Sequence, residues 1–145
     1  MKNKISYLFV YGTLRSQNGF TRMSADLIWP RAQVFGLQLF NLGAFPGAVP
    51  SSPEKRIIGE VYKINENILA QVDIYEGYRP DNPESSLYCR RTVEAQNIEN
   101  KSFLSSYVYI LNERRLIARN NYQLIENGDW LSLKDDKAKE KINEI

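Results

Sequence analysis

An almost uninterrupted apolar run near the amino terminus most constrains what this chain can fold into. Residues 5–10 (ISYLFV) are rich in aromatic and β-branched side chains, which is typical of a strand covered on both faces. Gly12 follows two residues later and permits a backbone turn that other residues resist. The sequence therefore predicts a strand at the centre of a sheet that ends in a tight turn.

Other segments have the apolar runs or the alternation expected of strands. The sequence predicts strands over 57–64, 88–93 and 103–111. A polar turn around 97–101 would join the last two as a hairpin. The segment 34–40 predicts a further extended run, and the glycines and prolines of 43–50 predict a loop without regular structure.

A helix is expected between the strands at 57–64 and 88–93. Asn65 or Asn67 can cap its amino end, and Gly77 occupies the usual position of a left-handed terminator. Glu76 then lies in the last turn. The apolar face of this helix is formed by Ile68, Leu69, Val72 and Tyr75.

Two segments nearer the ends of the chain carry separate predictions. Apolar side chains at Phe20, Met23 and Leu27 are three and four residues apart, which predicts a helix that Pro30 ends. No repeat or linker divides 1–133, which we expect to form a single domain. Residues 134–145 hold eight charges and few apolar anchors, so we expect a mobile tail.

The residue types present exclude several classes of active site. The chain has no histidine, which rules out Ser-His-Asp triads, Cys-His pairs and histidine metal ligands. No two of its eight glycines are spaced by two and no Gly-Lys-Ser or Gly-Lys-Thr triplet occurs, so dinucleotide fingerprints and phosphate loops are absent. The chemistry must rely on carboxylates, lysines, tyrosines, a lone thiol or the backbone.

Charge, cysteine content and hydropathy bear on partners and location. The net charge is +2, and basic and acidic residues are interspersed along the chain. No nucleic-acid-binding surface is therefore expected. The single cysteine, Cys89, is interpreted as a small apolar residue of a strand, and one thiol favours a reducing cytoplasm. The longest uncharged stretch, 32–53, contains glutamines, an asparagine and prolines, so no transmembrane segment is expected.

Three features remain that could carry chemistry: the turn over 11–14, the loop over 45–48 and the carboxylate of Glu76. The turn over 11–14 can direct backbone N–H groups towards a carboxylate or an oxyanion, although it can equally be a plain end of a strand. Glu76 can be a solvated carboxylate at a helix end. Alternatively, the negative end of the helix dipole, with Tyr75 and Tyr78 limiting water, would favour its acid form and raise its pKa.

Several motifs, taken in order, resemble the γ-glutamylcyclotransferase-like superfamily, which includes γ-glutamylcyclotransferases, γ-glutamylamine cyclotransferases and the butirosin-pathway cyclotransferase. The resemblance covers residues from 7 to about 111, and Gly128-Asp129-Trp130 looks like the closing segment of the family. The motifs are LFVYGTLR (8–15), LGAFPGA (42–48), IGEVY (58–62), VDIYEG (72–77), YCRR (88–91) and YVY (107–109). Val72 stands where the family usually has leucine, which leaves the following carboxylate in register.

The resemblance implies an α+β fold, a small mixed β-barrel flanked by helices, with a cavity at one mouth. It implies that Glu76 is the general acid/base and that the 11–14 loop binds the α-amino acid end of the substrate through its backbone. Tyr88 would lie near the cavity and Pro46-Gly47 in its wall. The implied substrate-binding residues are Tyr11, Gly12, Thr13, Leu14, Pro46, Gly47 and Tyr88.

The implied reaction converts a γ-glutamyl amide to 5-oxoproline and releases an amine or an amino acid. The nucleophile is the α-amine of the substrate, so no metal and no cofactor are expected, and the only partner expected is the small-molecule γ-glutamyl substrate. Two alternatives stay open: a non-catalytic small-molecule-binding module of the same fold, and an interaction protein that uses its surface and tail. The residues alone do not identify the γ-glutamyl amide or the oligomeric state.

Overall fold

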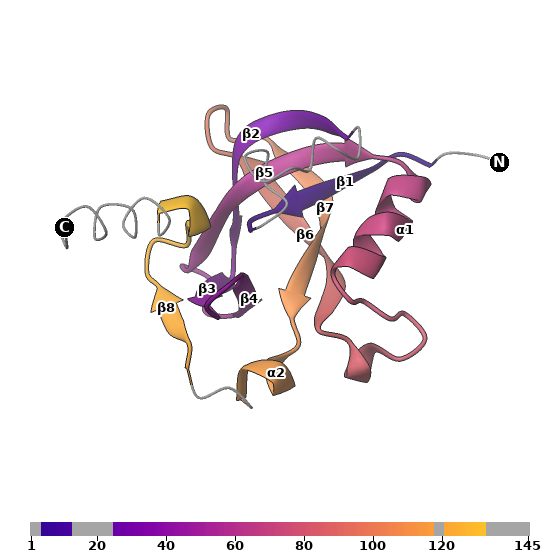
Figure 1. The fold of residues 1–145 in the computed structure, drawn as a ribbon. Coiled ribbons are helices and arrows are strands. Elements are labelled where there is room, and N and C mark those ends of the chain that lie inside the picture. Colours follow the sequence, from indigo (N-terminus) through magenta and orange to yellow (C-terminus); the bar gives the residue numbers. More distant parts are fainter. Residues whose placement is uncertain (1–3, 13–24, 118–120, 133–145) are drawn as a thin grey trace, which may run out of the picture.

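Five strands form a closed barrel. A computed structural model describes residues 4–12, 25–117 and 121–132. The strands follow each other around the barrel in the order β1-β5-β2-β6-β7 (Figure 1). They are β1 (Ser6–Val10), β2 (Asp26–Phe35), β5 (Arg56–Ile64), β6 (Tyr88–Asn97) and β7 (Phe103–Leu111). Neighbours are antiparallel except β1 and β7, which pair in parallel at Leu8 and Tyr107 and close the barrel.

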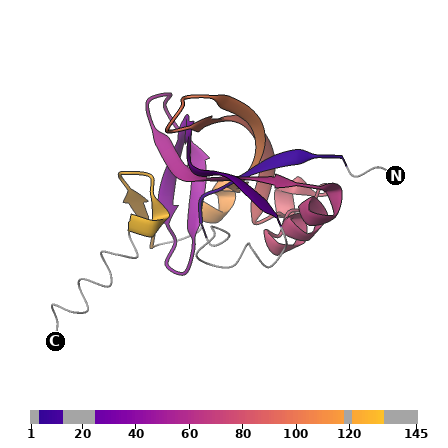
Figure 2. The same cartoon turned by 90° about the horizontal axis from the view of Figure 1, so that it is seen from above.

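A second, three-stranded sheet lies beside the barrel, in the order β4-β3-β8 (Figure 2). Its strands are β3 (Leu37–Asn41), β4 (Pro46–Pro50) and β8 (Gln123–Ile125). The prediction of an irregular loop over 43–50 is therefore wrong from Pro46 onward. Prolines stand at both ends of β4. Among the described strands, β4 lies at the edge of its sheet and pairs with β3 alone, so its missing N–H groups interrupt no central ladder.

The predicted helix ending at Pro30 is also wrong where the structure describes it, because Leu27 and Pro30 lie in β2. The pairing of β2 with β5 shifts register between Trp29 and Ala32, an irregularity that accommodates a proline within a strand. Phe20 and Met23 lie outside the described residues. Gly36, with φ +88°, divides the predicted run over 34–40 between β2 and β3.

The helix α1 (Glu66–Tyr75) confirms the capping prediction. Asn65 is the N-cap, and its Oδ1 accepts a hydrogen bond of 2.9 Å from the N–H of Ile68. At the other end Gly77 has φ +68°, and the N–H of Tyr78 donates to the carbonyl of Asp73 at 2.9 Å. Together with a bond from Gly77 to the carbonyl of Ile74, this is a Schellman motif that makes Glu76 the C-cap.

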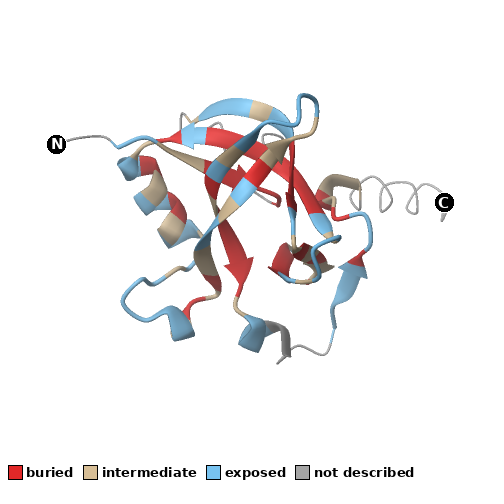
Figure 3. Ribbon diagram, turned by 180° about the vertical axis from the view of Figure 1, so that it is seen from behind, coloured by how far each residue is buried: buried red, intermediate tan, exposed pale blue. Residues whose placement is uncertain are grey.

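Helices flank the barrel, so the predicted α+β barrel is confirmed. A 3₁₀ turn (Pro83–Ser85) precedes β6, and α2 (Glu113–Ile117) follows β7. The α1 helix turns its buried side towards the strands and its exposed side outward (Figure 3). No helix in the described part of the chain is long and apolar enough to cross a membrane. The predicted tail over 134–145 lies outside the described residues.

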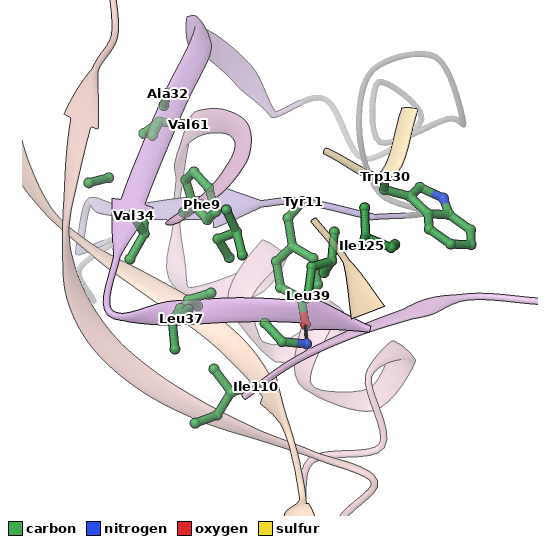
Figure 4. Packing of buried hydrophobic residues seen from close by; sticks show 14 residues of the cluster. Phe9, Tyr11, Ala32, Val34, Leu37, Leu39, Val61, Ile110, Ile125 and Trp130 are labelled. Atoms are coloured by element: carbon green, nitrogen blue, oxygen red, sulfur yellow. Dashed lines mark hydrogen bonds between the residues drawn. The ribbon is translucent and has the colours of Figure 1, made fainter. Parts of the chain in front are cut away.

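Alternation along β1 divides the core into two layers, as the double-sided apolar run predicted. Phe9 packs with Ala32, Val34 and Val61 in one cluster (Figure 4). Leu8 and Val10 point the other way, into a cluster that includes Ile68 and Val72 of α1. The strand is therefore covered on both faces, and α1 is attached to the barrel through the second layer.

Candidate active site

A cavity of about 210 Å³ lies between the barrel and the carboxyl end of α1. Its walls come from the end of β1, the segment leading into β4, the end of α1, and strands β6 and β7. Most of the lining is aromatic or aliphatic, and Glu76 is its only acidic side chain among the described residues. The lining residues are Phe9, Val10, Tyr11, Gly12, Ala44, Phe45, Pro46, Tyr75, Glu76, Leu87, Tyr88 and Tyr109.

Glu76 reaches this cavity because the Schellman motif ends α1 at that residue. Burial raises the pKa of Glu76 from its ordinary value of 4.5 to about 7. Within the described residues, its carboxylate makes no hydrogen bond and no salt bridge that would favour the charged form. The group can therefore exchange a proton near neutral pH, as the helix-end argument anticipated, although desolvation is the cause.

Tyr11 lines the cavity with its ring but uses its hydroxyl elsewhere. The hydroxyl donates to the carbonyl of Tyr109 at 2.6 Å. It also accepts a hydrogen bond of 3.2 Å from the N–H of Ala48, drawn as the dashed line at Tyr11 in Figure 4. Burial, with the nearby Tyr88 and Glu76, raises the pKa of Tyr11 well above 10. The Tyr11 hydroxyl thus stays protonated and connects β7 to β4.

Tyr88 has a similar arrangement on β6. Its hydroxyl donates to the carbonyl of Pro46 at 2.5 Å, and its ring meets that of Phe45 edge-on at 6.4 Å. The two tyrosines that the resemblance implied as substrate-binding therefore hold β4 at Pro46 and Ala48. Their rings, rather than their hydroxyl protons, face the cavity.

The remaining predicted residues divide between the cavity and its support. Gly12 and Pro46 line it together, and a Cβ at Gly12 would lie 2.7 Å from Cγ of Pro46, which explains the glycine. Gly47 is not in the lining. A Cβ there would lie 2.9 Å from Cδ2 of Leu111, so Gly47 allows β4 to pack against β7. Thr13 and Leu14 lie outside the described residues.

Tyr75, Phe45 and Tyr109 also line the wall, and none of them is in the substrate-binding set that the resemblance implied. Tyr75 was assigned to the apolar face of α1 yet is 55% exposed, and it lines the cavity beside Glu76. Tyr109 is buried, and its hydroxyl donates to Oδ1 of Asp73. The alternation of 107–109 gives a signal for the direction of Tyr109, but its partner on α1 depends on the tertiary structure.

The donor set of this site suits proton transfer rather than metal binding. Among the described residues, no three acidic or cysteine side chains cluster in a way that could hold a metal ion. One carboxylate with a raised pKa, enclosed by aromatic rings, can take and return a proton next to a bound organic molecule.

Comparison with known proteins identifies the family. Residues 8–132 match the model of the family described as γ-glutamyl cyclotransferase, AIG2-like. The chain belongs to this family. A Vibrio cholerae relative named for γ-glutamylcyclotransferase is 34% identical over 125 residues, which are 85% of this chain and 93% of the relative.

A further relative and a solved structure extend the comparison. The γ-L-glutamyl-butirosin B γ-glutamyl cyclotransferase of Niallia circulans is 28% identical over 125 residues, covering 85% of this chain and 74% of the relative. The crystal structure of YkqA from Bacillus subtilis has a TM-score of 0.70 at 24% identity, and the match covers 94% of this chain and 43% of YkqA. This structural likeness shows that the two chains share a fold.

Proposed function

We propose that the protein is a γ-glutamylcyclotransferase that converts a γ-glutamyl amide to 5-oxoproline, with Glu76 as general acid and base. One observation carries the proposal: the only described carboxylate in an aromatic cavity has a pKa of about 7. Family membership over residues 8–132 supports the same activity. The butirosin-pathway relative is named for this type of reaction on its own substrate.

The reaction needs one nucleophile, which belongs to the substrate, and one proton shuttle. Ionised Glu76 accepts a proton from the α-ammonium group, and the resulting amine attacks the γ-carbonyl carbon. A new C–N bond forms and closes the five-membered ring. Protonated Glu76 then gives this proton to the departing nitrogen as the original amide C–N bond breaks. The attacking nitrogen loses its second proton through Glu76 to the same released amine, which gives 5-oxoproline with one lactam N–H and the amine as its ammonium. Glu76 ends in the state in which it began.

The cavity wall contributes orientation. A γ-glutamyl chain must fold so that its amine meets its own carbonyl, and holding such a conformer can lower the barrier by roughly 7–11 kcal/mol in favourable intramolecular cases. The rings of Tyr11 and Tyr88 restrict the space, since their hydroxyls are engaged with the backbone. We propose that the 11–14 loop holds the α-amino acid end of the substrate through its backbone. The reaction requires no cofactor, and the single thiol of Cys89 suits a reducing cytoplasm.

Glu76→Gln tests the proposal. Purified protein is incubated with a panel of γ-glutamyl donors, namely γ-glutamyl amino acids, γ-glutamyl polyamines and ε-linked γ-glutamyl-lysine, and 5-oxoproline is measured by mass spectrometry. We expect the substitution to lower kcat by about 10²- to 10⁴-fold, because it keeps the shape and removes the base. In the wild type, kcat/KM should rise with pH through an apparent pKa near 7.

Glu66→Gln is the matched control, since Glu66 is exposed at the other end of the same helix. It should leave kcat within about twofold. Full turnover in a correctly folded Glu76→Gln variant would contradict the role of Glu76. Binding of a donor without any 5-oxoproline, detected by thermal shift, would instead identify a non-catalytic binding module.

A further inference from the structure

A second polar cluster lies directly behind the cavity wall, outside the proposed chemistry. Asp73 of α1 accepts two hydrogen bonds from Nη1 of Arg90 on β6, at 2.9 Å to Oδ1 and 2.7 Å to Oδ2. The hydroxyl of Tyr109 on β7 donates to the same Oδ1. The Asp73 and Arg90 side chains are only 16% and 22% exposed, so solvent screens this pair less than a surface ion pair.

Aromatic rings enclose the cluster on two sides. The Arg90 guanidinium carbon lies 4.8 Å from the ring centre of Tyr107 and 5.4 Å from that of Tyr78. Tyr78, the second residue after Glu76, also meets the ring of Tyr109 edge-on at 6.4 Å. Burial alone would lower the pKa of Arg90, but Asp73 and Tyr109 raise it. Arg90 therefore stays charged. It lies between strands β6 and β7 and Tyr78, which follows the helix.

The buried apolar positions of α1 stop at Val72, short of its carboxyl end. The fully buried positions of the helix are Ile68 and Val72. Beyond Val72, Ile74 is 81% exposed and Tyr75 is 55% exposed. Asp73 follows Val72 directly, and its bonds to Arg90 and Tyr109 join the helix to the barrel three residues before Glu76.

Asp73 also takes part in the helix terminator. Its carbonyl accepts the N–H of Tyr78 in the Schellman motif, while its carboxylate binds Arg90 and Tyr109. One residue therefore connects the local geometry of the C-cap to two barrel strands. A shift of this residue would move the Glu76 backbone relative to the cavity.

We infer that Asp73, held by Arg90 and Tyr109, is the positioning residue that keeps the Glu76 carboxylate facing the cavity. The expected effect on kcat rests on the proposed function, whereas the position of the Glu76 carboxylate does not. Glu76 shares the cavity with the phenols of Tyr11, Tyr75, Tyr88 and Tyr109, and Asp73 and Arg90 lie behind Tyr109. Releasing the helix end would expose Glu76 to water, so its pKa would return towards 4.5.

Tyr109→Phe is the decisive variant because it keeps the ring in the wall and removes only the donor to Asp73. We expect kcat to fall about 10- to 100-fold while KM stays within about twofold, because a small misplacement of a catalytic group slows the chemical step. The pKa of the Glu76 carboxyl, followed by ¹³C NMR in the free protein, should drop by about one unit or more. Asp73→Asn should behave in the same way.

Tyr107→Phe is the matched control, since Tyr107 lies two residues away on β7 with its ring against Arg90. It should change neither kcat nor the pKa of Glu76. Arg90→Gln separates position from charge. Loss of a nearby cation would by itself raise the pKa of Glu76, whereas release of the helix end lowers it, so a fall supports the inference and a rise contradicts it.

The NMR titration also separates this inference from the proposed function. If Tyr109→Phe and Asp73→Asn lower the melting temperature but leave kcat and the Glu76 pKa unchanged, the cluster only stabilises the fold and the inference is wrong. If the Glu76 pKa falls in both variants while wild-type protein forms no 5-oxoproline from any donor, the positioning role holds and the proposed reaction fails.

Discussion

The strand wall and the helix wall of the cavity use their polar groups in opposite ways. In the strand wall, formed by Tyr11, Tyr88 and Tyr109 with their neighbours, each tyrosine hydroxyl is hydrogen-bonded to a backbone carbonyl or to Asp73. In the helix wall, formed by Tyr75 and Glu76, the carboxylate makes no hydrogen bond or salt bridge within the described residues. The tyrosine hydroxyls of the strand wall thus have hydrogen-bond partners, whereas the helix wall carries a desolvated carboxyl group.

This difference separates shape from reactivity. A buried polar group with a partner adds rigidity, whereas a buried carboxylate without one costs free energy and acquires a raised pKa. The strand wall therefore defines the space, and the helix wall supplies the titratable group. Substitutions in the first wall should lower the free energy of unfolding, and substitution of Glu76 should raise it.

The largest effect is expected from Gly59→Ala in β5, behind the strand wall. A Cβ at Gly59 would lie 2.2 Å from the carbonyl oxygen of Val10 and 2.8 Å from Cζ of Phe9. Because β1 and β5 pair up to Val10 and Glu60, next to Gly59, the backbones cannot separate without breaking the barrel. We expect a loss of about 3 kcal/mol or more in the free energy of unfolding, measured by urea denaturation.

Gly36→Ala is the control for this substitution. Gly36 has φ +88°, but nothing lies within 4 Å of an added Cβ, so only conformational strain opposes the change. That strain should cost about 1–2 kcal/mol. Equal losses for the two variants would show that the close approach of β1 to β5 does not limit the strand wall.

A smaller loss is expected from Tyr11→Phe. Removing the hydroxyl leaves the carbonyl of Tyr109 and the N–H of Ala48 without this partner in a buried setting, at a cost of about 2 kcal/mol in unfolding free energy. Tyr88→Phe removes the bond to one carbonyl, that of Pro46, and should cost about 1 kcal/mol. Since neither hydroxyl proton is offered to the cavity, kcat should change less than tenfold in both variants. A collapse of kcat in Tyr11→Phe with unchanged stability would make that hydroxyl catalytic instead.

Features set by short-range chemistry could be predicted from the sequence. The caps of α1 at Asn65 and Gly77 depend on residues within one or two turns, so they fixed both the end of the helix and the place of Glu76. The double-sided burial of β1 likewise follows from its own composition. The closed barrel came from the family resemblance, because pairing between β1 and β7 is set by contacts distant in sequence.

The errors lie where a partner strand decides the outcome. Pro46 and Pro50 argue for a loop in isolation, yet both are tolerated because β4 is an edge strand. Pro30 is tolerated where the β2–β5 register shifts. The cluster behind the site could not be predicted for the same reason, since Asp73 and Tyr109 are 36 residues apart and meet only through the packing of α1 on β7.

The effect with the opposite sign concerns the helix wall. The pKa of Glu76 is about 7 in the folded protein, above its ordinary value of 4.5, so the folded state binds more protons than the unfolded state between these values. The free energy of unfolding that Glu76 contributes should therefore be fully present below about pH 4.5 and be lost as the pH rises to about 7.

Glu76→Gln removes this ionisation. A shift of this size corresponds to at most about 3 kcal/mol, and the partial solvent access of the side chain reduces the expected effect to about 1–2 kcal/mol. The variant should match wild type in unfolding free energy at pH 4 and exceed it at pH 8, while Glu66→Gln follows wild type at both values. Denaturation curves at the two pH values measure the difference. A Glu76→Gln variant that is no more stable than wild type at pH 8 would mean that the carboxylate is well solvated, and the contrast between the two walls would then not hold.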